Sequence, residues 1–413
     1  MILNKNPLML SILSGVLLTL SWPVQGLSFL IFFSLIPLFF VEDQISRMNS
    51  KQKKFCLFAL SYLGFFIWNI GTTWWIMNSS VFGMAFAIVC NTLFYTILMM
   101  LFHWSKKRLP LRTAYIFFVT LWIAFEKFHL EWDFSWPWLN LGNVFSEDVQ
   151  WIQWYEFTGS FGGSLWILII NIGFYEVLKN YPVSLKNTVW VKKMSPWLIC
   201  IAIPIAISLI IFERENNLVP NTEVLLLQPN IDPYNEKYSK ENDYFFDLLI
   251  NMTTDQITDE TRYIFTPETY FGEGFGSSLE EFKTTTLHRK IDSLLEKNPK
   301  IQLVSGIQSY SVYKTDKPPT PTANFIRNGI WVDFYNSALK MEFQQEPEFY
   351  HKSKLVVGVE NMPYKSFFKP LFGEFLLDLG GTVSSRAIQN NRSVFEHKKI
   401  NLKTGPVICY ESI

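Results

Sequence analysis

The sequence predicts two domains of different class, a bundle of about seven membrane-spanning helices followed by an α/β sandwich. Hydrophobic residues make up 49 % of the chain and charged residues only 17 %, whereas soluble domains usually carry about 25 % charged residues. Long apolar runs fill the chain up to about Phe212, and from Glu213 on the composition is mixed and strand-like. We therefore assign residues 1–213 to a transmembrane helical domain and residues 220–413 to the second domain.

Charge and cysteine content exclude several classes of protein. The formal net charge is zero, so the chain has no basic excess with which to neutralise nucleic-acid phosphates, and no nucleic-acid partner is expected. Its four cysteines are too few and too scattered for a disulfide framework. Three of them lie inside apolar runs and are expected to pack in helices, namely Cys56, Cys90 and Cys200. The fourth, Cys409, lies near the end of the chain.

Seven apolar runs are candidate spans, because a bilayer core requires about 20 apolar helical residues. They are residues 8–22, 27–41, 55–77, 82–104, 113–130, 160–178 and 197–212. The first two are short, and the alternative is a tight helical hairpin around Trp22-Pro23. Lys5 precedes the first run as in a signal peptide, but no small-residue cleavage site follows, so we expect a retained helix.

Basic residues alternate between loops, and this alternation predicts the orientation. They gather in loops 42–54, 103–112 and 179–196. Neither Lys nor Arg occurs in loops 22–26, 78–81 and 131–159. Basic loops stay in the cytoplasm, so the N-terminus is inside and an odd number of spans places the second domain outside. We therefore predict a multi-pass membrane protein whose second domain lies outside; in a bacterium that is an inner-membrane protein with its second domain in the periplasm.

The aromatic and polar residues in the membrane half can each be interpreted in two ways. The tryptophans on the outer side fit an ordinary interfacial belt, but the loop Ser135–Gly142 is rich in Pro, Gly and Asn and favours a lipid-facing vestibule. Asn91 and Asn171 lie in the middle of spans. We expect each of them to bond a neighbouring helix rather than a ligand.

The second half alternates strands with helices, which is why an α/β class is predicted. Strands are predicted at Thr222–Gln228, Arg262–Thr266 and Ile301–Gly306, helices at 235–257 and 278–297, and a hairpin around Asn336-Ser337. The glycines in 272–276 do not have the spacing of a dinucleotide-binding loop. This run is expected to be a loop.

Three side chains near predicted strand ends could form a reaction centre: Glu268, Lys352 and Cys409. Pro406–Ile408 is expected to be a short buried strand with the Cys409 thiol at its tip. A carboxylate can take the proton of a thiol, and an ammonium can lower the thiol pKa and stabilise an oxyanion. Taken singly, each has a plain alternative, a packing cysteine or a solvated charge. The residues alone do not choose between Lys352 and Lys354.

Several motifs together suggest a family. The segments LLLQPNI, TPET, YNSA, YHKSKLVVGVE and ICYES resemble the nitrilase (carbon–nitrogen hydrolase) superfamily, and the two last are the most specific. The segments LSWPVQGLSFLIFFSLIPLFF, SWPWLNLG and FGGSLWILIINIGFY are similar to the membrane half of the apolipoprotein N-acyltransferase family. The resemblance implies a nitrilase-like αββα sandwich on a multi-span domain.

The resemblance also implies roles for individual residues. Glu268 matches the general base of the family, Lys352 its catalytic lysine and Cys409 its nucleophile. Further positions match supporting residues of the site, namely Glu360, Tyr410, Glu411 and, in a lid arm, Tyr238. Neither a metal nor a cofactor is expected.

The activity implied is acyl transfer from a phospholipid, expected to be phosphatidylethanolamine, to the N-terminal amine of the diacylglyceryl-cysteine of an apolipoprotein. A thioester on Cys409 would be the intermediate of this ping-pong reaction. One alternative is a membrane-tethered amidase with the same triad, although a single anchoring helix would suffice for that. Another is a scaffold without catalysis that binds lipid or a partner.

The sequence departs from the family pattern in two places. Val357–Val359 stands where the family usually has Pro-Phe-Gly, although Glu360 itself is kept. The family continues past its nucleophile with further strands and a final span, whereas this sequence ends at Ile413. The resemblance therefore predicts a sandwich that is incomplete at its C-terminal end.

Overall fold

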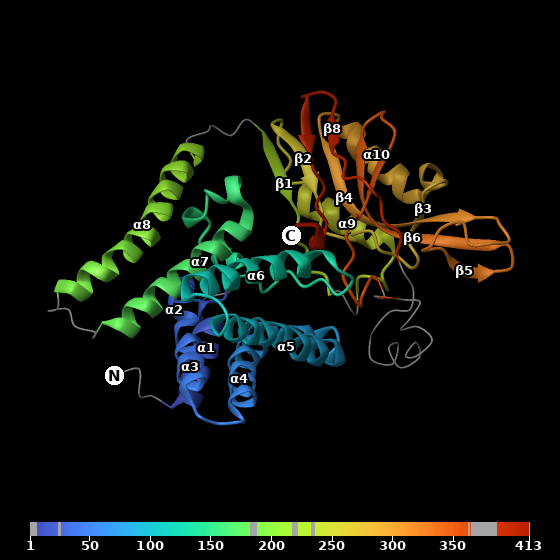
Figure 1. Ribbon diagram of the computed structural model, residues 1–413. Coiled ribbons are helices and arrows are strands. Elements are labelled where there is room, and N and C mark those ends of the chain that lie inside the picture. Colours follow the sequence, from blue (N-terminus) through green and yellow to red (C-terminus); the bar gives the residue numbers. More distant parts are fainter. Residues whose placement is uncertain are drawn as a thin grey trace. The chain divides into compact units, whose positions relative to one another are not determined.

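The computed structural model divides into two compact units, Met1–Leu218 and Val219–Ile413 (Figure 1). It describes residues 6–23, 26–181, 188–216, 222–232, 236–361, 364 and 386–412. The first unit is helical and the second is built on a mixed β-sheet. This agrees with the predicted order of a helical part followed by an α/β part.

The seven predicted apolar runs all fall largely on helical elements of the helical unit, and the second run, residues 27–41, is divided among three of them. The elements of this unit are α1 Pro7–Ser21, η2 Ser28–Leu30, α2 Ile31–Ser34, α3 Ile36–Arg47, α4 Lys53–Thr73, η3 Trp74–Asn78, α5 Val81–Lys106, α6 Leu111–Glu131, η4 Leu141–Phe145, η5 Val149–Trp151, α7 Tyr155–Asn180 and α8 Thr188–Asn216. Among the described residues, five helical segments are long and apolar enough to cross a membrane. They are Ser28–Arg47, Lys53–Asn78, Val81–Lys106, Tyr155–Asn180 and Thr188–Arg214. α1 is apolar but shorter, and α6 is not among the five.

Close helix packing and buried amides hold this unit together. A Cβ on Gly15 of α1 would lie 2.5 Å from the carbonyl oxygen of Gly64 on α4, so the missing side chain lets these two helices approach. The side chain of Asn171 accepts a hydrogen bond from the Leu35 amide and donates one to the Ile31 carbonyl, both at 2.9 Å. It thereby satisfies backbone groups at the break between α2 and α3, which lipid could not do.

The expectation that the mid-span asparagines bond neighbouring helices is confirmed. Asn171 of α7 does so at the α2–α3 break, and Oδ1 of Asn91 on α5 lies 2.7 Å from Nε2 of His129 on α6. The loop between α6 and α7 is anchored in the same way. The Glu126 carboxylate accepts from the Leu141 amide at 2.8 Å, and the Gly142 amide donates to Ser164 Oγ at 2.9 Å.

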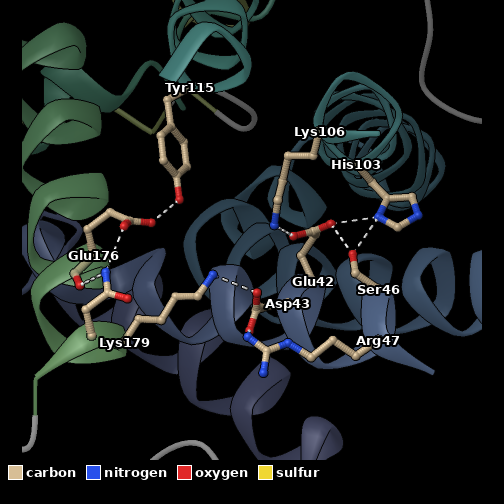
Figure 2. Close-up of polar contacts among 10 residues, drawn as sticks. Glu42, Asp43, Ser46, Arg47, His103, Lys106, Tyr115, Glu176 and Lys179 are labelled. Atoms are coloured by element: carbon tan, nitrogen blue, oxygen red, sulfur yellow. Dashed lines mark hydrogen bonds and ion pairs between the residues drawn. The ribbon is translucent and has the colours of Figure 1, made fainter. Parts of the chain in front are cut away.

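Ion pairs tie α3 to α5 and α7 (Figure 2). The buried Glu42 carboxylate lies 2.7 Å from Nδ1 of His103 and also accepts from Lys106. Its neighbour Asp43 pairs with Lys179 at 2.8 Å. A buried carboxylate is tolerated only with such partners, so these pairs specify how the three helices meet.

The second unit contains a seven-stranded sheet in the order β1-β2-β4-β6-β5, with β3 paired to β4 and β7 to β6. Its strands are β1 Glu223–Leu226, β2 Thr261–Phe265, β3 Ser277–Ser278, β4 Gln302–Tyr313, β5 Asn324–Arg327, β6 Ile330–Glu342 and β7 Glu348–His351. β1, β2 and β4 are parallel, and β6 is antiparallel to β4, β5 and β7. The parallel strands are joined through α9 Asn242–Thr253 and α10 Thr286–Lys297.

The two faces of the sheet bury different clusters. Leu303 of β4 packs in a core with residues of α9 and α10, including Phe245 and Ile291. The next residue, Val304, points to the opposite face, as strand geometry requires. There it joins a smaller cluster that includes Phe395, the first residue of β8 Phe395–His397, which pairs with β9 Leu402–Thr404.

Two local predictions for this unit were wrong. β6 runs straight through Asn336-Ser337, and the hairpin turn lies instead at Asn328-Gly329, between β5 and β6. Gly329 has a φ of 72°, a left-handed backbone that glycine adopts without strain. The two helices also begin later than predicted, at Asn242 and Thr286.

Candidate active site

Glu268 lies on a loop that leaves β2 and lies directly on β4. The Phe271 amide donates to the Gly306 carbonyl at 3.0 Å, which fixes the loop against the strand. A Cβ on Gly306 would lie 2.8 Å from the carbonyl carbon of Glu268 and closer still to the Pro267 oxygen. Only glycine at this position lets the loop lie so close.

Replacing Gly306 by Ala is therefore expected to push the Glu268 loop off β4. We expect at least a hundredfold loss of reactivity at this centre, the scale that a displacement of about 1 Å at a reaction centre can produce. Gly405→Ala is the matched control, because a Cβ there would meet only Val394 at 4.0 Å. Equal reactivity of the Cys409 thiol centre in the two variants would show that Gly306 does not position the Glu268 loop.

Lys352 follows β7 and is held between two carboxylates. Its side chain is only 1 % exposed, and its Nζ lies 3.2 Å from Oε1 of Glu268 and 2.8 Å from Oε2 of Glu360. Burial disfavours the charged form, but the charges of Glu360 and Glu268 outweigh it and raise the pKa of Lys352. The ammonium therefore stays charged at neutral pH.

Lys352 and Lys354, between which the sequence alone does not choose, have different partners in the structure. Nζ of Lys354 lies 5.4 Å from the centroid of the Tyr410 ring. Lys352, by contrast, bonds both carboxylates. The ammonium of Lys354 therefore lies over the buried Tyr410 ring.

Asn336 is part of the site and was missed by the sequence reasoning, which placed it in a turn. It is 3 % exposed on β6, and its Nδ2 donates to Oε1 of Glu268 at 2.6 Å and to Oε1 of Glu360 at 2.9 Å. The backbone carbonyl of Asn336 also accepts from the Lys352 amide at 2.8 Å. One strand residue therefore positions both carboxylates and the lysine.

Glu360 is the more enclosed of the two carboxylates. Its side chain is 11 % exposed, against 32 % for Glu268. Burial alone would raise its pKa, but Lys352, the Val356 amide and Asn336 together lower it. A tight turn, in which the Glu360 amide donates to the Val356 carbonyl at 3.0 Å, positions Glu360 despite the departure from the family pattern just before it.

Cys409 begins a short 3-10 helix, η7 Cys409–Ser412, and is exposed. The predicted strand before it is wrong: residues 405–408 form no strand. The Ile408 amide donates to Oε2 of Glu411 at 2.8 Å and the Ile408 carbonyl accepts from the Glu411 amide at 3.2 Å, so a local turn uses the groups that a strand would pair. Cys409 itself has a φ of 49°, a strained backbone of the kind found at functional turns.

The charges of Glu268 and Lys352 both act on the Cys409 thiol. Partial burial and the Glu268 carboxylate raise the pKa of Cys409, and the opposing effect of Lys352 is smaller. The thiol is therefore protonated at neutral pH. A nucleophile in this state requires a base, and the Glu268 carboxylate is close enough for its charge to act on the thiol.

Glu411 fastens the segment that carries Cys409. Its Oε1 accepts from the Tyr350 hydroxyl at 2.5 Å and from the Ser353 amide at 2.7 Å. These bonds outweigh burial and lower the pKa of Glu411. Because Tyr350 and Ser353 flank Lys352, the same carboxylate links the lysine segment to the thiol segment.

Tyr238 lies apart from this network. It is 46 % exposed in the turn 236–240, beside Gly272. Among the described residues, no hydrogen bond joins it to Glu268, Lys352 or Cys409. The preceding residue, Lys237, was not singled out from sequence, yet it is close enough for the charges of Glu268 and Cys409 to act on it, while burial lowers its pKa.

Metal ligands do not cluster in the part of the chain that the structure describes, where no group of three or more His, Cys, Asp and Glu residues could hold an ion. The chemistry available from these residues is that of a thiol, a carboxylate base and a fixed ammonium. Such a set suits covalent acyl transfer.

Known proteins resemble this chain over both units. Residues 14–173 match the apolipoprotein N-acyltransferase N-terminal domain. The apolipoprotein N-acyltransferase of Chlorobaculum tepidum is 25 % identical over 425 residues, which cover 100 % of this chain and 76 % of that protein. The one from Rickettsia prowazekii is 24 % identical over 83 % of this chain and 61 % of that protein. The one from Geobacter metallireducens is 24 % identical over 55 % of this chain and 44 % of that protein. The chain is thus similar to the apolipoprotein N-acyltransferases, both in the matched domain and over the aligned length of these relatives.

Proposed function

We propose that this chain transfers an acyl group from a phospholipid to the N-terminal amine of the diacylglyceryl-cysteine of an apolipoprotein. The observation that carries the proposal is the convergence of Glu268, Lys352 and Cys409 in one unit of a chain whose other unit is apolar and helical. Both substrates are lipids, so a membrane-embedded enzyme can receive them without extracting them into water. The relatives named above support this choice of reaction.

The first half-reaction forms a thioester. Glu268 takes the proton of the Cys409 thiol, and the thiolate attacks an ester carbonyl of the phospholipid. The Lys352 ammonium stabilises the oxyanion that develops on that carbonyl oxygen. The ester C–O bond then breaks, the lysophospholipid oxygen takes the proton from Glu268, and the acyl group remains on the sulfur.

The second half-reaction forms the amide. The amine of the acceptor attacks the thioester carbonyl and gives a proton to Glu268. The C–S bond breaks, and the Cys409 thiolate takes this proton from Glu268 as the N-acylated product leaves. The two half-reactions use the same base, Glu268, and the same ammonium, Lys352, so the proposed chemistry requires no cofactor.

Exposure supports Glu268, and not Glu360, as the base. Glu268 is about three times as exposed as Glu360, so an incoming thiol or amine can reach it. Glu360 is the positioning carboxylate, which keeps Lys352 charged and in place. Asn336 holds the two carboxylates at a fixed separation through one amide group.

The location and architecture follow the same proposal. We infer about seven spans, an inner-membrane location and a periplasmic second unit from the alternation of basic loops. The second unit is proposed to be a nitrilase-like αββα sandwich. The acyl donor is proposed to be phosphatidylethanolamine of the outer leaflet.

The test is the intact mass of the purified protein in detergent, with and without phosphatidylethanolamine. We expect one acyl group per chain, labile to hydroxylamine and absent from Cys409→Ala. Cys200→Ala is the matched control, since Cys200 is also an exposed free cysteine, and it should retain the adduct. An adduct that persists in Cys409→Ala, or that never forms, would overturn the proposal; rapid loss of the adduct to water would favour an amidase.

A further inference from the structure

A hollow of about 460 Å³ lies among α6, α7 and α8 in the helical unit. Arg112 from the start of α6 and Lys193 from α8 line it, together with Glu176 and Asn180 near the end of α7. All of these residues lie on the side that carries the basic loops. The hollow therefore shares no residue with the candidate active site, which belongs entirely to the second unit.

Two cations of this hollow are uncommitted. Within the described ranges, neither Arg112 nor Lys193 forms an ion pair; the Lys193 ammonium lies only over the Tyr181 ring, 6.0 Å from its centroid. Other lysines at this end of the bundle are committed: Lys179 pairs with Asp43, for example. An unpaired cation beside a hollow is available to an anionic ligand.

The acidic residue in the lining, Glu176, is already bonded. Its carboxylate accepts from the Tyr115 hydroxyl and from Asn180 Nδ2, the latter at 3.0 Å, and Figure 2 shows it directed toward Tyr115. The lining contains two cations, Arg112 and Lys193, and one carboxylate, Glu176, so its net charge is one positive unit. A phosphodiester carries the complementary single negative charge.

The rest of the lining is apolar and aromatic, which favours a lipid over a soluble anion. The Trp197 indole lies against α7 at Gly173, in space that a Cβ would fill. The next residues of α8, Leu198 and Ile199, are each 52 % exposed on an apolar surface. Tryptophan and tyrosine beside basic side chains are typical of the membrane interface, and acyl chains could extend along α8 from a headgroup held in the hollow.

We propose that this hollow binds the headgroup of an anionic phospholipid in the leaflet on the basic-loop side. Basic pockets between transmembrane helices on the cytoplasmic side are suited to such headgroups. The site is distinct from that of the acyl donor, because the proposed chemistry takes place on the opposite side of the membrane. The inference does not rest on the proposed enzymatic activity.

The test uses the whole chain in nanodiscs of phosphatidylcholine that contain a small fraction of phosphatidylglycerol. Retained phosphatidylglycerol is measured by native mass spectrometry after release into detergent. Each basic side chain near an anionic lipid contributes roughly a fivefold effect, so the Arg112→Gln/Lys193→Gln variant should retain about 25-fold less. The matched control, Lys51→Gln/Lys54→Gln, removes the same charge from another basic loop and should change retention less than twofold.

Equal losses in the two double variants, or no loss in the first, would overturn the proposal, because each outcome would mean that binding is not localised to the hollow. Competition by soluble glycerol phosphate at the same concentration would overturn the choice of a lipid. If the double variant does not fold, Lys193→Gln alone, on the exposed side of α8, should still lower retention about fivefold.

Discussion

Replacing Glu268 by Gln is expected to slow thioester formation about a thousandfold, within the range that loss of a general base produces. The amide has the shape of the carboxylate and can still accept from Asn336 Nδ2, which lies 2.6 Å from Oε1. It cannot take the proton of the Cys409 thiol. The measurement is the rate at which the acyl adduct appears by intact mass in a single turnover.

The same variant should change the thiol in the opposite sense. The Glu268 charge raises the pKa of Cys409, so its removal lowers that pKa and increases the fraction of thiolate at any pH below it. Alkylation of Cys409 by iodoacetamide should therefore be faster in Glu268→Gln, and its pH profile should move to lower pH. Faster alkylation with slower acyl transfer is the signature of a base, which a merely structural residue would not produce.

Glu273→Gln provides the matched control for this pair of measurements. Glu273 is an exposed carboxylate on the same loop, bonded to the Asn242 amide at 2.8 Å. Both rates should stay within twofold of the unmodified protein. If alkylation and transfer fell together in Glu268→Gln, the loop would have been disturbed, and Glu268 would lose its proposed role.

The helical unit was largely predictable because lipid imposes a strong constraint on sequence. A helix in lipid must bury its backbone polar groups and present apolar side chains over about 20 residues, so each apolar run marked a helix. The number of spans is harder to predict, because α1 is short and α6 carries Arg112, Glu126 and Lys127 within its length. How deeply α1 and α6 lie in the membrane depends on their packing against other helices, and amino-acid composition gives no information on that packing.

The site was predictable in its reactive groups but not in its geometry. The segment around Lys352 offers two lysines, and only the fold shows which of them meets the carboxylates. Asn336-Ser337 is a dipeptide common in turns, yet β6 buries it because Glu268 and Glu360 supply partners that lie far away in sequence. In the segment before Cys409, the apolar run favoured a strand, but the Glu411 carboxylate captures the Ile408 amide instead.

Replacing Lys352 by Met is expected to be the most destabilising change in the site. It leaves the Glu268 and Glu360 carboxylates facing each other without their shared cation, and Glu360 is only 11 % exposed. Removing one partner of a buried ion pair costs about 3–5 kcal/mol of unfolding free energy. Acyl transfer should also fall at least a hundredfold, since the oxyanion loses its stabilising charge. Hydrogen exchange of the β6 amides measures the first effect and the adduct assay the second.

The pH dependence identifies which charge causes the loss. In the unmodified protein the pKa of Glu360 is lowered, so its stabilising effect is present above the unfolded value of about 4.3 and disappears as the pH falls through the folded value. Without Lys352, burial raises the pKa of Glu360, and this carboxyl becomes neutral at a higher pH. The deficit of Lys352→Met should therefore be smaller at pH 5 than at pH 7. The pKa of Lys352 is raised, so its own contribution is constant over this range. Lys354→Met, the neighbouring control, should lose less than about 1 kcal/mol at both pH values; equal deficits in the two variants would mean that the carboxylates do not depend on Lys352.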